Sequence, residues 1–351
     1  MEKEEIHMKA KAAFLTDIRK IEMGEIDIPD PEATEIQIKL EYVGICGSDV
    51  HFYEHGRIGT KQVTYPFILG HECSGKVSKI GKSARGFAIG DPVALEPGVP
   101  CGRCEYCKDG KYNICPDVKF MAAPPTNGAF VEYINHPAHM TFGLPSNVSL
   151  LEGALVEPLA VGMHAARQGE VIPGKTVIIL GAGCIGLTTL LACKSMGASN
   201  IVVTDLYDKR LAKAKELGAK YTVNVSNGDA IASLQALVNG EGYDLVFETA
   251  GTNITAAQTG YLVRRGGTIV IVGNIPGDTS FNFRNLTINE ATLKTVFRYR
   301  NIYPTAIDEI AAGRIDVKSI VSDEYGFEST HEAFERALCD KETAVKVVVK
   351  M

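Results

Sequence analysis

Long apolar runs are missing from this sequence of 351 residues: no segment stays apolar over the thickness of a bilayer. Residues 1–7 are charged where a secretory signal would be apolar, so we expect a cytoplasmic protein without a membrane partner. An excess of positive charge is missing too, because 36 Lys and Arg stand against 42 Asp and Glu, for a net charge of −6. Such a chain offers no basic surface for a phosphate backbone, so nucleic acid is not an expected partner.

Internal repeats, low-complexity segments and linkers are also lacking, and the composition, 45% hydrophobic and 22% charged, is that of a globular protein. A chain of this length exceeds the size at which one hydrophobic core usually stops growing, so we expect two domains. The sequence has nine cysteines. Because cytosolic thiols are kept reduced, we expect metal ligation or burial of these residues rather than a disulfide framework.

Short strands and turns dominate the first part of the sequence. From about residue 12 to residue 156, segments such as 36–40 and 75–80 alternate apolar and polar residues, and Gly and Pro punctuate them. This pattern predicts an all-β domain.

After Lys175 the pattern changes to apolar runs of strand length that alternate with helical segments. The expected strands are 176–180, 201–204, 221–225, 243–248, 268–272 and 293–297, and the expected helices include 185–196, 209–217 and 230–238. Six such runs with helical crossovers predict a doubly wound parallel sheet and an α/β fold class. Beyond Arg298 we expect one more helix, 305–312, and a terminal strand, 344–349, that could return to the first domain.

A glycine motif follows the first of these strands. Gly181, Gly183 and Gly186 form G-x-G-x-x-G at the opening of a helix. The first Gly permits a tight turn, the second lets the backbone approach a pyrophosphate, and the third lets helix and strand pack closely. Because glycine-rich turns also occur for structural reasons, the motif alone is weak, but its position between strand and helix favours dinucleotide binding.

Asp205 stands at the end of the second expected strand, nineteen residues after Gly186. A carboxylate there can accept hydrogen bonds from the adenosine ribose hydroxyls and would repel a 2′-phosphate, which favours NAD over NADP. The alternative is that Asp205 caps the next helix. Arg210 either stacks on the adenine or is solvated on the helix surface.

Four cysteines lie within fifteen residues: Cys101, Cys104, Cys107 and Cys115. Zinc held by four thiolates forms a closed tetrahedral site, and the C-x-x-C spacing lets successive ligands reach one ion. Two disulfides or incidental clustering are the alternatives, and a zinc ribbon that binds nucleic acid is a rival from another class. The acidic chain and the single knuckle argue against the ribbon, so we expect a structural zinc without room for a substrate.

A second set of potential ligands comes from separated segments: Cys46, His71 with Glu72, and Glu157. A thiolate, an imidazole and a carboxylate that converge would make a three-ligand zinc site with its fourth position open. Spacing alone leaves this open, because single Cys, His and Glu residues are more often packed or exposed than ligands.

Two motifs resemble a known family. G-H-E-x2-G-x5-G at 70–81 is similar to the zinc signature of the medium-chain alcohol dehydrogenases, and G-I-C-G-S-D at 44–49 resembles the segment that carries their catalytic cysteine. The cysteine spacing is similar to that of their structural zinc lobe, and the glycine motif stands where their coenzyme domain begins. The resemblance covers essentially the whole chain.

This resemblance implies a GroES-like catalytic domain over 1–157 with the structural zinc lobe at 101–115, a Rossmann NAD-binding domain over 158–297, and a C-terminal segment, 298–351, that returns to the catalytic domain. It also implies two zinc ions per chain, one catalytic and one structural, NAD as coenzyme, and a homotetramer.

Within the family the chain is most similar to sorbitol dehydrogenase and related bacterial polyol dehydrogenases, through residues 55–59, 157–159 and 296–299. This likeness implies oxidation of a polyol at a secondary carbon to the ketose. Phe52 departs from the animal enzymes, where a Tyr contacts the substrate, and this leaves the exact polyol open. The four-cysteine ladder, absent from some mammalian members, suggests a bacterial-type relative.

The resemblance also assigns roles to residues. It implies that Cys46, His71 and Glu72 hold the catalytic zinc, and that Glu157 holds its water or exchanges with Glu72. Ser48 and His51 occupy the proton-relay positions, although His51 could instead be a surface histidine. The implied coenzyme contacts are Gly181, Gly183, Ile185, Gly186, Asp205, Arg210, Val272, Gly273, Phe297 and Arg298, and the implied substrate contacts are Phe52, Glu157, Arg298 and Tyr299.

Several alternatives remain at this stage. Arg298 could pair with a coenzyme phosphate, and Tyr299 could belong to the core. Another zinc enzyme of the family, acting on threonine, a butanediol or a sugar phosphate, competes with the polyol assignment. A non-catalytic relative that binds coenzyme is a hypothesis from a different class, which the intact set of potential zinc ligands disfavours.

Overall fold

The computed structural model of the protein describes residues 8–227 and 230–351, so the charged residues 1–7 lie outside the described part. The chain forms two compact units. The first comprises the described part of Met1–Glu157 together with Tyr303–Ala311 and Val321–Met351, and the second comprises Pro158–Ile302 and Ala312–Ile320. Along the described residues, no helix combines the length and the apolar character needed to span a bilayer.

Antiparallel sheets build the first unit. A seven-stranded sheet has the order β12-β8-β7-β3-β20-β19, with β11 also paired to β3, and a three-stranded sheet has the order β2-β1-β6. The strands are β1 Met8–Asp17, β2 Lys20–Ile28, β3 Glu35–Gly44, β4 Arg57–Ile58, β5 Lys61–Gln62, β6 Phe67–Ile68, β7 Glu72–Ile80, β8 Pro92–Leu95, β9 Gly98–Val99, β10 Lys119–Phe120, β11 Tyr133–Pro137, β12 Thr141–Gly143, β19 Asp323–Gly326 and β20 Val347–Lys350.

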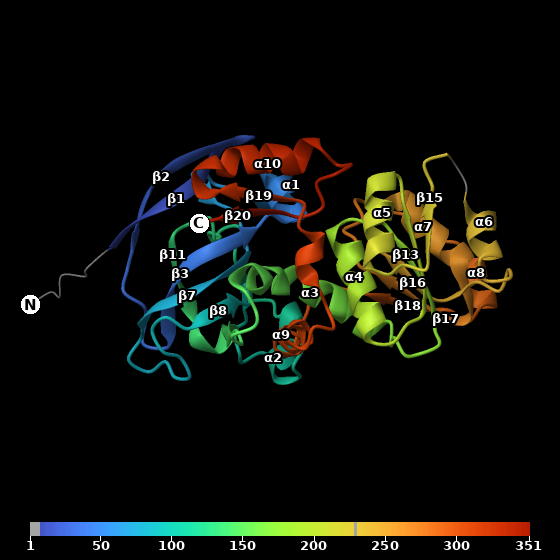
Figure 1. Cartoon of the computed structure of the whole chain (residues 1–351), viewed down its shortest axis with the longest axis horizontal. Helices are drawn as coiled ribbons and strands as arrows, with labels where there is room; N and C mark the ends of the chain where they lie inside the picture. The colour runs from blue at the N-terminus through green and yellow to red at the C-terminus, as the bar shows by residue number, and fades with distance from the viewer. Residues whose placement is uncertain (1–7, 228–229) are drawn as a thin grey trace, which may run out of the picture. The chain divides into compact units, whose positions relative to one another are not determined.

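The C-terminal strand β20 completes this sheet. It pairs antiparallel with the end of β3, where Val348 faces Gly44, and parallel with β19. In Figure 1 the red β20 lies among the blue strands of the N-terminal part, although the two segments are far apart in the sequence. Val347, Val348 and Val349 are buried, so this edge of the core depends on the last residues of the chain.

Helices also occur in the first unit, so the expectation of an all-β domain is wrong. They are α1 Gly47–His55, α2 Glu105–Lys108, the first turns of α3 Leu150–Gln168, α9 Tyr303–Ala311 and α10 Thr330–Cys339. Helix α1 forms because Asp49, at its third position, accepts a hydrogen bond from the Cys46 backbone N–H at 3.1 Å, and Gly56 ends it in the left-handed conformation.

Helix α10 was not expected, because only one helix was anticipated beyond Arg298. Its buried residues Thr330, Ala333, Phe334 and Leu338 follow helical spacing, so the sequence contains the signal. The expected helix at 305–312 is present as α9, whose Tyr303 hydroxyl donates to the Leu95 carbonyl at 2.8 Å.

A six-stranded parallel sheet builds the second unit, in the order β15-β14-β13-β16-β17-β18. The strands are β13 Thr176–Leu180, β14 Asn200–Asp205, β15 Tyr221–Asn224, β16 Tyr243–Glu248, β17 Val263–Ile271 and β18 Thr292–Thr295, and the helices are α4 Cys184–Ser195, α5 Asp208–Leu217, α6 Ile231–Ala236, α7 Asn253–Leu262 and α8 Phe283–Ile288. Helices α7 and α8 fall where helical crossovers were expected, although the sequence analysis gave no bounds for them, and the doubly wound sheet is confirmed.

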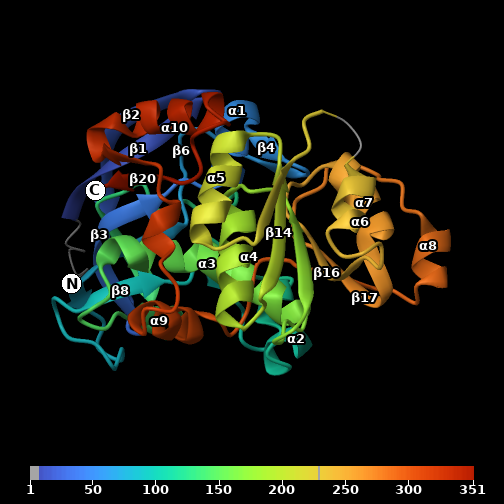
Figure 2. The ribbon, with the colours of Figure 1, turned by 45° about the vertical axis from the view of Figure 1, so that its right-hand side comes forward.

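The strand order reverses between β13 and β16, and this reversal positions a binding site. Strands β14 and β15 extend to one side of β13 and β16 to β18 to the other, so right-handed crossovers place helices on both faces. Figure 2 shows α4 and α5 side by side next to β14. In such sheets ligands bind beyond the carboxyl ends of the strands at the reversal, which here is the segment that begins at Gly181.

Candidate functional site

The ligand atoms of Cys46, His71 and Glu72 lie within 4.8 Å of one another in the first unit. Cys46 precedes α1, His71 directly precedes β7, and Glu72 is the first residue of β7 and pairs with Gly44 of β3. His71 and Glu72 are 5% and 1% exposed. The pairing of β3 with β7 thus brings together three side chains that the sequence separates.

Asp49 organises this group, although the sequence analysis did not single it out. Its carboxylate accepts hydrogen bonds from the backbone N–H groups of Cys46 and Gly70, each at 3.1 Å, and lies 3.4 Å from His71 Nδ1. Burial alone would lower the pKa of His71, but the Asp49 carboxylate and the Cys46 thiol hold that pKa well above its usual value. The group therefore favours positive charge at its centre.

Lys346 is a second residue that the sequence analysis missed. Its ammonium donates to both carboxylate oxygens of Glu72 at 2.7 Å and to the Ile45 carbonyl at 2.9 Å. Lys346 is 2% exposed, so this is a buried ion pair, and it comes from the residue directly before β20. Gly44 leaves room for the carboxylate, because a Cβ there would lie 2.1 Å from Glu72 Oε2. No local motif signals Lys346, since 274 residues separate it from Glu72.

Glu157 is the last residue of the first segment of the first unit and lies outside that group of three. It is 5% exposed. Burial, with a smaller contribution from the charge of Glu157, raises the pKa of Cys73 to about 12 and that of Glu96 to about 7. Glu157 therefore lies near both side chains. Glu96 accepts a hydrogen bond from the Tyr112 hydroxyl at 2.8 Å.

Helix α1 carries the other residues that we associated with catalysis. Ser48 is half-buried and His51 is exposed. Partial burial and the neighbouring His55 lower the pKa of His51. Phe52, expected to contact a substrate, is 5% exposed and packs in the hydrophobic core of this unit.

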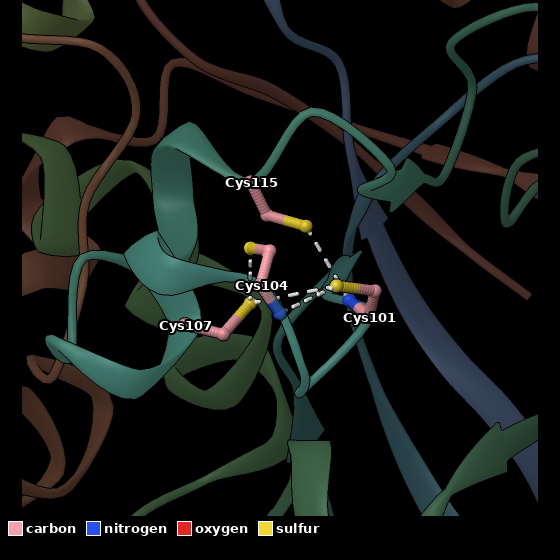
Figure 3. A group of neighbouring side chains, drawn as sticks. All are labelled: Cys101, Cys104, Cys107 and Cys115. Carbon is pink, nitrogen blue, oxygen red and sulfur yellow. Dashed lines mark hydrogen bonds between the residues drawn. The ribbon is translucent and has the colours of Figure 1, made fainter.

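The four cysteines of the lobe converge as well. The Sγ atoms of Cys101, Cys104, Cys107 and Cys115 lie within 4.8 Å of one another, and Figure 3 shows them turned toward a common centre. The Sγ of Cys107 lies 3.4 Å from that of Cys104 and 4.0 Å from that of Cys101. Backbone N–H groups of Arg103 and Cys104 lower the pKa of Cys101 to about 6, because they stabilise its thiolate.

Both groups fit zinc. Zn–S bonds of about 2.3 Å in tetrahedral geometry place sulfur atoms about 3.8 Å apart, close to the distances in the lobe. The Cys46 group offers a thiolate, an imidazole and a carboxylate, which is a three-ligand set with an open fourth position. All nine cysteines are free thiols, and five of them belong to the two groups of potential ligands. Cys73 and Cys193 are buried, but Cys339 is exposed and Cys184 half-buried, so the expectation of metal ligation or burial does not hold for those two.

In the second unit the glycine motif forms a tight turn between β13 and α4. Gly181 has a φ of 107°, which other residues rarely adopt, and Gly183 caps α4. A Cβ on Gly186 would lie 1.9 Å from the Gly181 carbonyl oxygen, so only glycine fits there. Ile185, half-buried in the first turn of α4, accepts the Thr189 hydroxyl at 2.7 Å.

Asp205 lies beside this turn. Its Oδ2 accepts from the Ala182 N–H at 2.7 Å, and its Oδ1 accepts from the N–H groups of Leu206 and Tyr207. Helix α5 begins at Asp208 with Tyr207 as its cap, so Asp205 is not the helix cap. The Arg210 guanidinium lies over the Tyr207 ring, and its Nη1 would be 3.6 Å from a Cβ on Gly183.

Glu248, the last residue of β16, is another residue that the sequence analysis did not single out. It hydrogen-bonds the segments that follow β16 and β17 at the carboxyl edge of the sheet. It is fully buried, its Oε1 accepts from the Gly251 N–H at 2.8 Å and from the Thr255 hydroxyl at 2.7 Å, and its carbonyl accepts from Val272 and Gly273. A Cβ on Gly273 would lie 2.4 Å from the Gly251 nitrogen. These close approaches hold the ends of β16 and β17 together.

The segment after β18 presents the last expected residues. Phe297 is 56% exposed, and the Arg298 guanidinium lies 4.7 Å from the centre of its ring. Tyr299 is 3% exposed, which agrees with the alternative that it packs in the core.

Comparison with known proteins places the chain in a family. The Alcohol dehydrogenase GroES-like domain matches residues 32–146, and the Zinc-binding dehydrogenase family matches residues 184–312. The chain is 51% identical to the uncharacterized zinc-type alcohol dehydrogenase-like protein YdjJ of Escherichia coli K12, over 98% of this chain and 99% of the relative. It is 44% identical to the sorbitol dehydrogenase of Bacillus subtilis 168, over 97% and 96% of the two chains.

A solved structure of a dehydrogenase has the same fold as this chain. A chain from Escherichia coli CFT073, described as a short chain alcohol dehydrogenase complexed with NADH, matches with a TM-score of 0.92 at 27% identity, over 98% of this chain and 99% of that one. The expected pairing of a GroES-like domain with a Rossmann sheet is thereby confirmed. This chain therefore belongs to the zinc-type medium-chain alcohol dehydrogenases and is an oxidoreductase of that family.

Proposed function

We propose that this protein oxidises a secondary hydroxyl of a polyol such as sorbitol or xylitol to the ketose, with hydride transfer to NAD. The observation that carries the proposal is the buried Glu72 carboxylate with its Lys346 partner beside Cys46 and His71. These charged groups make the surroundings of the metal site polar, where a dehydrogenase for simple alcohols resembles an apolar slot. The 44% identity to a sorbitol dehydrogenase supports the same substrate class.

The chain's own residues divide the work. Cys46, His71 and Glu72 would hold the catalytic zinc, Asp49 orients His71 through its contact with Nδ1, and Lys346 fixes Glu72. When bound there, zinc supplies Lewis-acid polarisation of the substrate hydroxyl. Glu157 completes the polar lining.

Ser48 and His51 carry the hydroxyl proton away from the site. They lie three residues apart on α1 and therefore on one face of the helix. The lowered pKa of His51 keeps its ring neutral near pH 7, and a neutral imidazole can accept the proton.

The coenzyme is proposed to bind at the carboxyl edge of the parallel sheet. There the turn from Gly181 to Gly186 leaves room for a pyrophosphate at the start of α4, and Asp205 stands where the adenosine ribose would lie. Among the described residues, Asp205 Oδ2 accepts only the Ala182 N–H and keeps accepting capacity for a ribose hydroxyl, while the charge of the carboxylate disfavours a 2′-phosphate. We further propose Arg298 as a donor to the substrate and the coenzyme.

A substrate panel tests the proposal. Zinc-loaded protein is assayed with NAD and with sorbitol, xylitol, ethanol, butan-2-ol, threonine and a sugar phosphate, read by nicotinamide absorbance. Polyols should exceed simple alcohols in kcat/KM by as much as about 10⁴-fold, because a substrate without the extra hydroxyls leaves polar groups unpaired. Equal kcat/KM for ethanol and the best polyol would refute the substrate class.

The assembly and compartment are part of the proposal. We propose a homotetramer in the cytoplasm, where the nine free thiols would stay reduced. Analytical ultracentrifugation of the zinc-loaded protein tests the assembly, and a monomer at micromolar concentration would contradict it.

A further inference from the structure

The loop between β18 and α9 has an unusual backbone. Arg298 has a φ of 55° and Asn301 a φ of 52°, so two non-glycine residues within four positions adopt the left-handed conformation. This region is unfavourable for Arg, and such a conformation persists only where the surrounding structure holds it. The loop carries Arg298, which we propose as a ligand of coenzyme and substrate.

An arginine on helix α3 hydrogen-bonds the backbone of this loop. The Arg167 guanidinium donates from Nη2 to the Arg300 carbonyl at 2.5 Å and from Nη1 to the Asn301 carbonyl at 3.3 Å. The planar fork of an arginine binds two neighbouring acceptors in one fixed geometry, which a lysine ammonium does not. The carbonyls that it fixes lie on either side of the strained backbone of Asn301, and they begin two residues after Arg298.

His164 orients this arginine from the preceding turn of α3. Its Nδ1 lies 3.0 Å from Arg167 Nη2, and because a guanidinium has only donors, Nδ1 must be the acceptor and the ring proton must sit on Nε2. Burial, together with Arg167 and Arg300, lowers the pKa of His164 to about 4. The ring is therefore neutral near pH 7 and keeps Nδ1 free of a proton.

We propose that Arg167, oriented by His164, is a positioning residue that fixes the loop at 297–301 and so aims Arg298 at its ligand. This inference rests on the proposed function, because it takes Arg298 to contact coenzyme and substrate. Arg167 touches neither of them in this account. It acts through the loop backbone, so its loss should lower affinity for the coenzyme rather than the stability of the fold alone.

The test compares Arg167→Met with Arg298→Ala and with Arg265→Met, an exposed arginine on β17 that serves as the control. NADH binding is measured by fluorescence titration of the zinc-loaded protein, beside KM for the best polyol and thermal stability. Arg167→Met and Arg298→Ala should each weaken NADH binding and raise KM about tenfold, and Arg265→Met should change neither. On the Arg298→Ala background, Arg167→Met should add little, because both act through one contact.

Conservative variants separate positioning from folding. Arg167→Lys keeps the charge without the fork and should stay folded while losing NADH affinity. His164→Asn keeps an acceptor near the Nδ1 position and should bind NADH nearly as the wild type does, whereas His164→Leu should not.

Two outcomes contradict different claims. If Arg298→Ala weakens NADH binding while folded Arg167→Met and Arg167→Lys bind NADH as the wild type does, the positioning role is wrong and the proposed function stands. If Arg298→Ala itself leaves NADH binding and polyol KM unchanged, the proposed role of Arg298 is wrong, and the positioning of that residue has no function to serve.

Discussion

A glycine beside the metal site helps to set its geometry, because it leaves space for a ligand side chain. Gly44 faces Glu72 across two strands, and a Cβ there would lie 2.1 Å from Glu72 Oε2. Gly47, three residues on, has open space where its Cβ would be. Glu72 is buried and held by Lys346, so it has no free path away from a new methyl group.

Replacing Gly44 by Ala should therefore displace the Glu72 carboxylate and weaken zinc binding at the open site by about 100-fold, while the cysteine lobe keeps its ion. Gly47→Ala is the matched control and should bind zinc as the wild type does. Zinc affinity is measured by competition with a chromophoric chelator. Similar affinities for the two variants would show that Glu72 is not held where the structure places it.

Asp205 governs the choice of coenzyme in our account. The double variant Asp205→Ala with Leu206→Arg removes the carboxylate at the proposed ribose site and adds a phosphate partner at an exposed position. Its ratio of kcat/KM for NADP to that for NAD should rise by about 100-fold or more. Wild-type turnover with NADP as efficient as with NAD would contradict the role of Asp205.

Elements differ in how they serve the two predicted zinc ions. The lobe around α2 is a short helix and turns without a buried apolar residue in the helix, so its shape depends on the four thiols. The open site instead lies where the end of β3 pairs with the start of β7, at the margin of an extensive sheet. Loss of the zinc in the cysteine lobe should therefore unfold the lobe, whereas loss of the zinc at the Cys46 group should leave the sheet intact.

This difference predicts opposite behaviour of two variants. Cys104→Ser should lower the free energy of unfolding by about 4 kcal/mol, because the lobe loses a ligand of its only organising centre. His71→Ala should leave a folded protein without turnover. Urea unfolding followed by circular dichroism, beside the polyol assay, measures both. A stable Cys104→Ser protein would argue against a structural zinc in the lobe.

Across the whole molecule, buried neutral histidines make stability depend on pH. Burial lowers the pKa of His136 to about 4, and its Nε2 lies 3.0 Å from the Glu96 carbonyl. An unfolded histidine takes up a proton near pH 6.5, whereas folded His136 does so only near pH 4. Since the unfolded state binds more protons between these values, stability falls as pH falls from 6.5 to 4, by about 3 kcal/mol for this group.

His136→Gln keeps a donor near the Nε2 position but does not titrate, so its loss of stability between pH 7 and pH 4.5 should be smaller than that of the wild type. Urea unfolding at a series of pH values measures the difference. Burial raises the pKa of Glu96 to about 7, so this residue makes stability rise as pH falls. Because both proteins contain Glu96, its contribution cancels in the difference between them. His139→Gln, at an exposed position, is the control and should keep the wild-type slope.

Much of this molecule is predictable from local sequence, and the reason is physical. The strand at 176–180, the glycine turn and the cysteine lobe depend on residues close in the chain, and the structure has all three. Asp49 was within reach, because its spacing from Cys46 is that of a capping box. Lys346 and Arg167 could not be predicted from local sequence. Their partners, Glu72 and Arg300, lie 274 and 133 residues away, and only tertiary packing brings them together.

The most direct test of the account is a count of zinc by native mass spectrometry on protein purified without chelators, repeated after mild chelation. We predict two zinc ions per chain at first, then one after chelation, with polyol oxidation lost and circular dichroism unchanged, because the cysteine lobe is closed and the Cys46 group is open. One zinc or none before chelation, or full activity after the loss of an ion, would contradict the account.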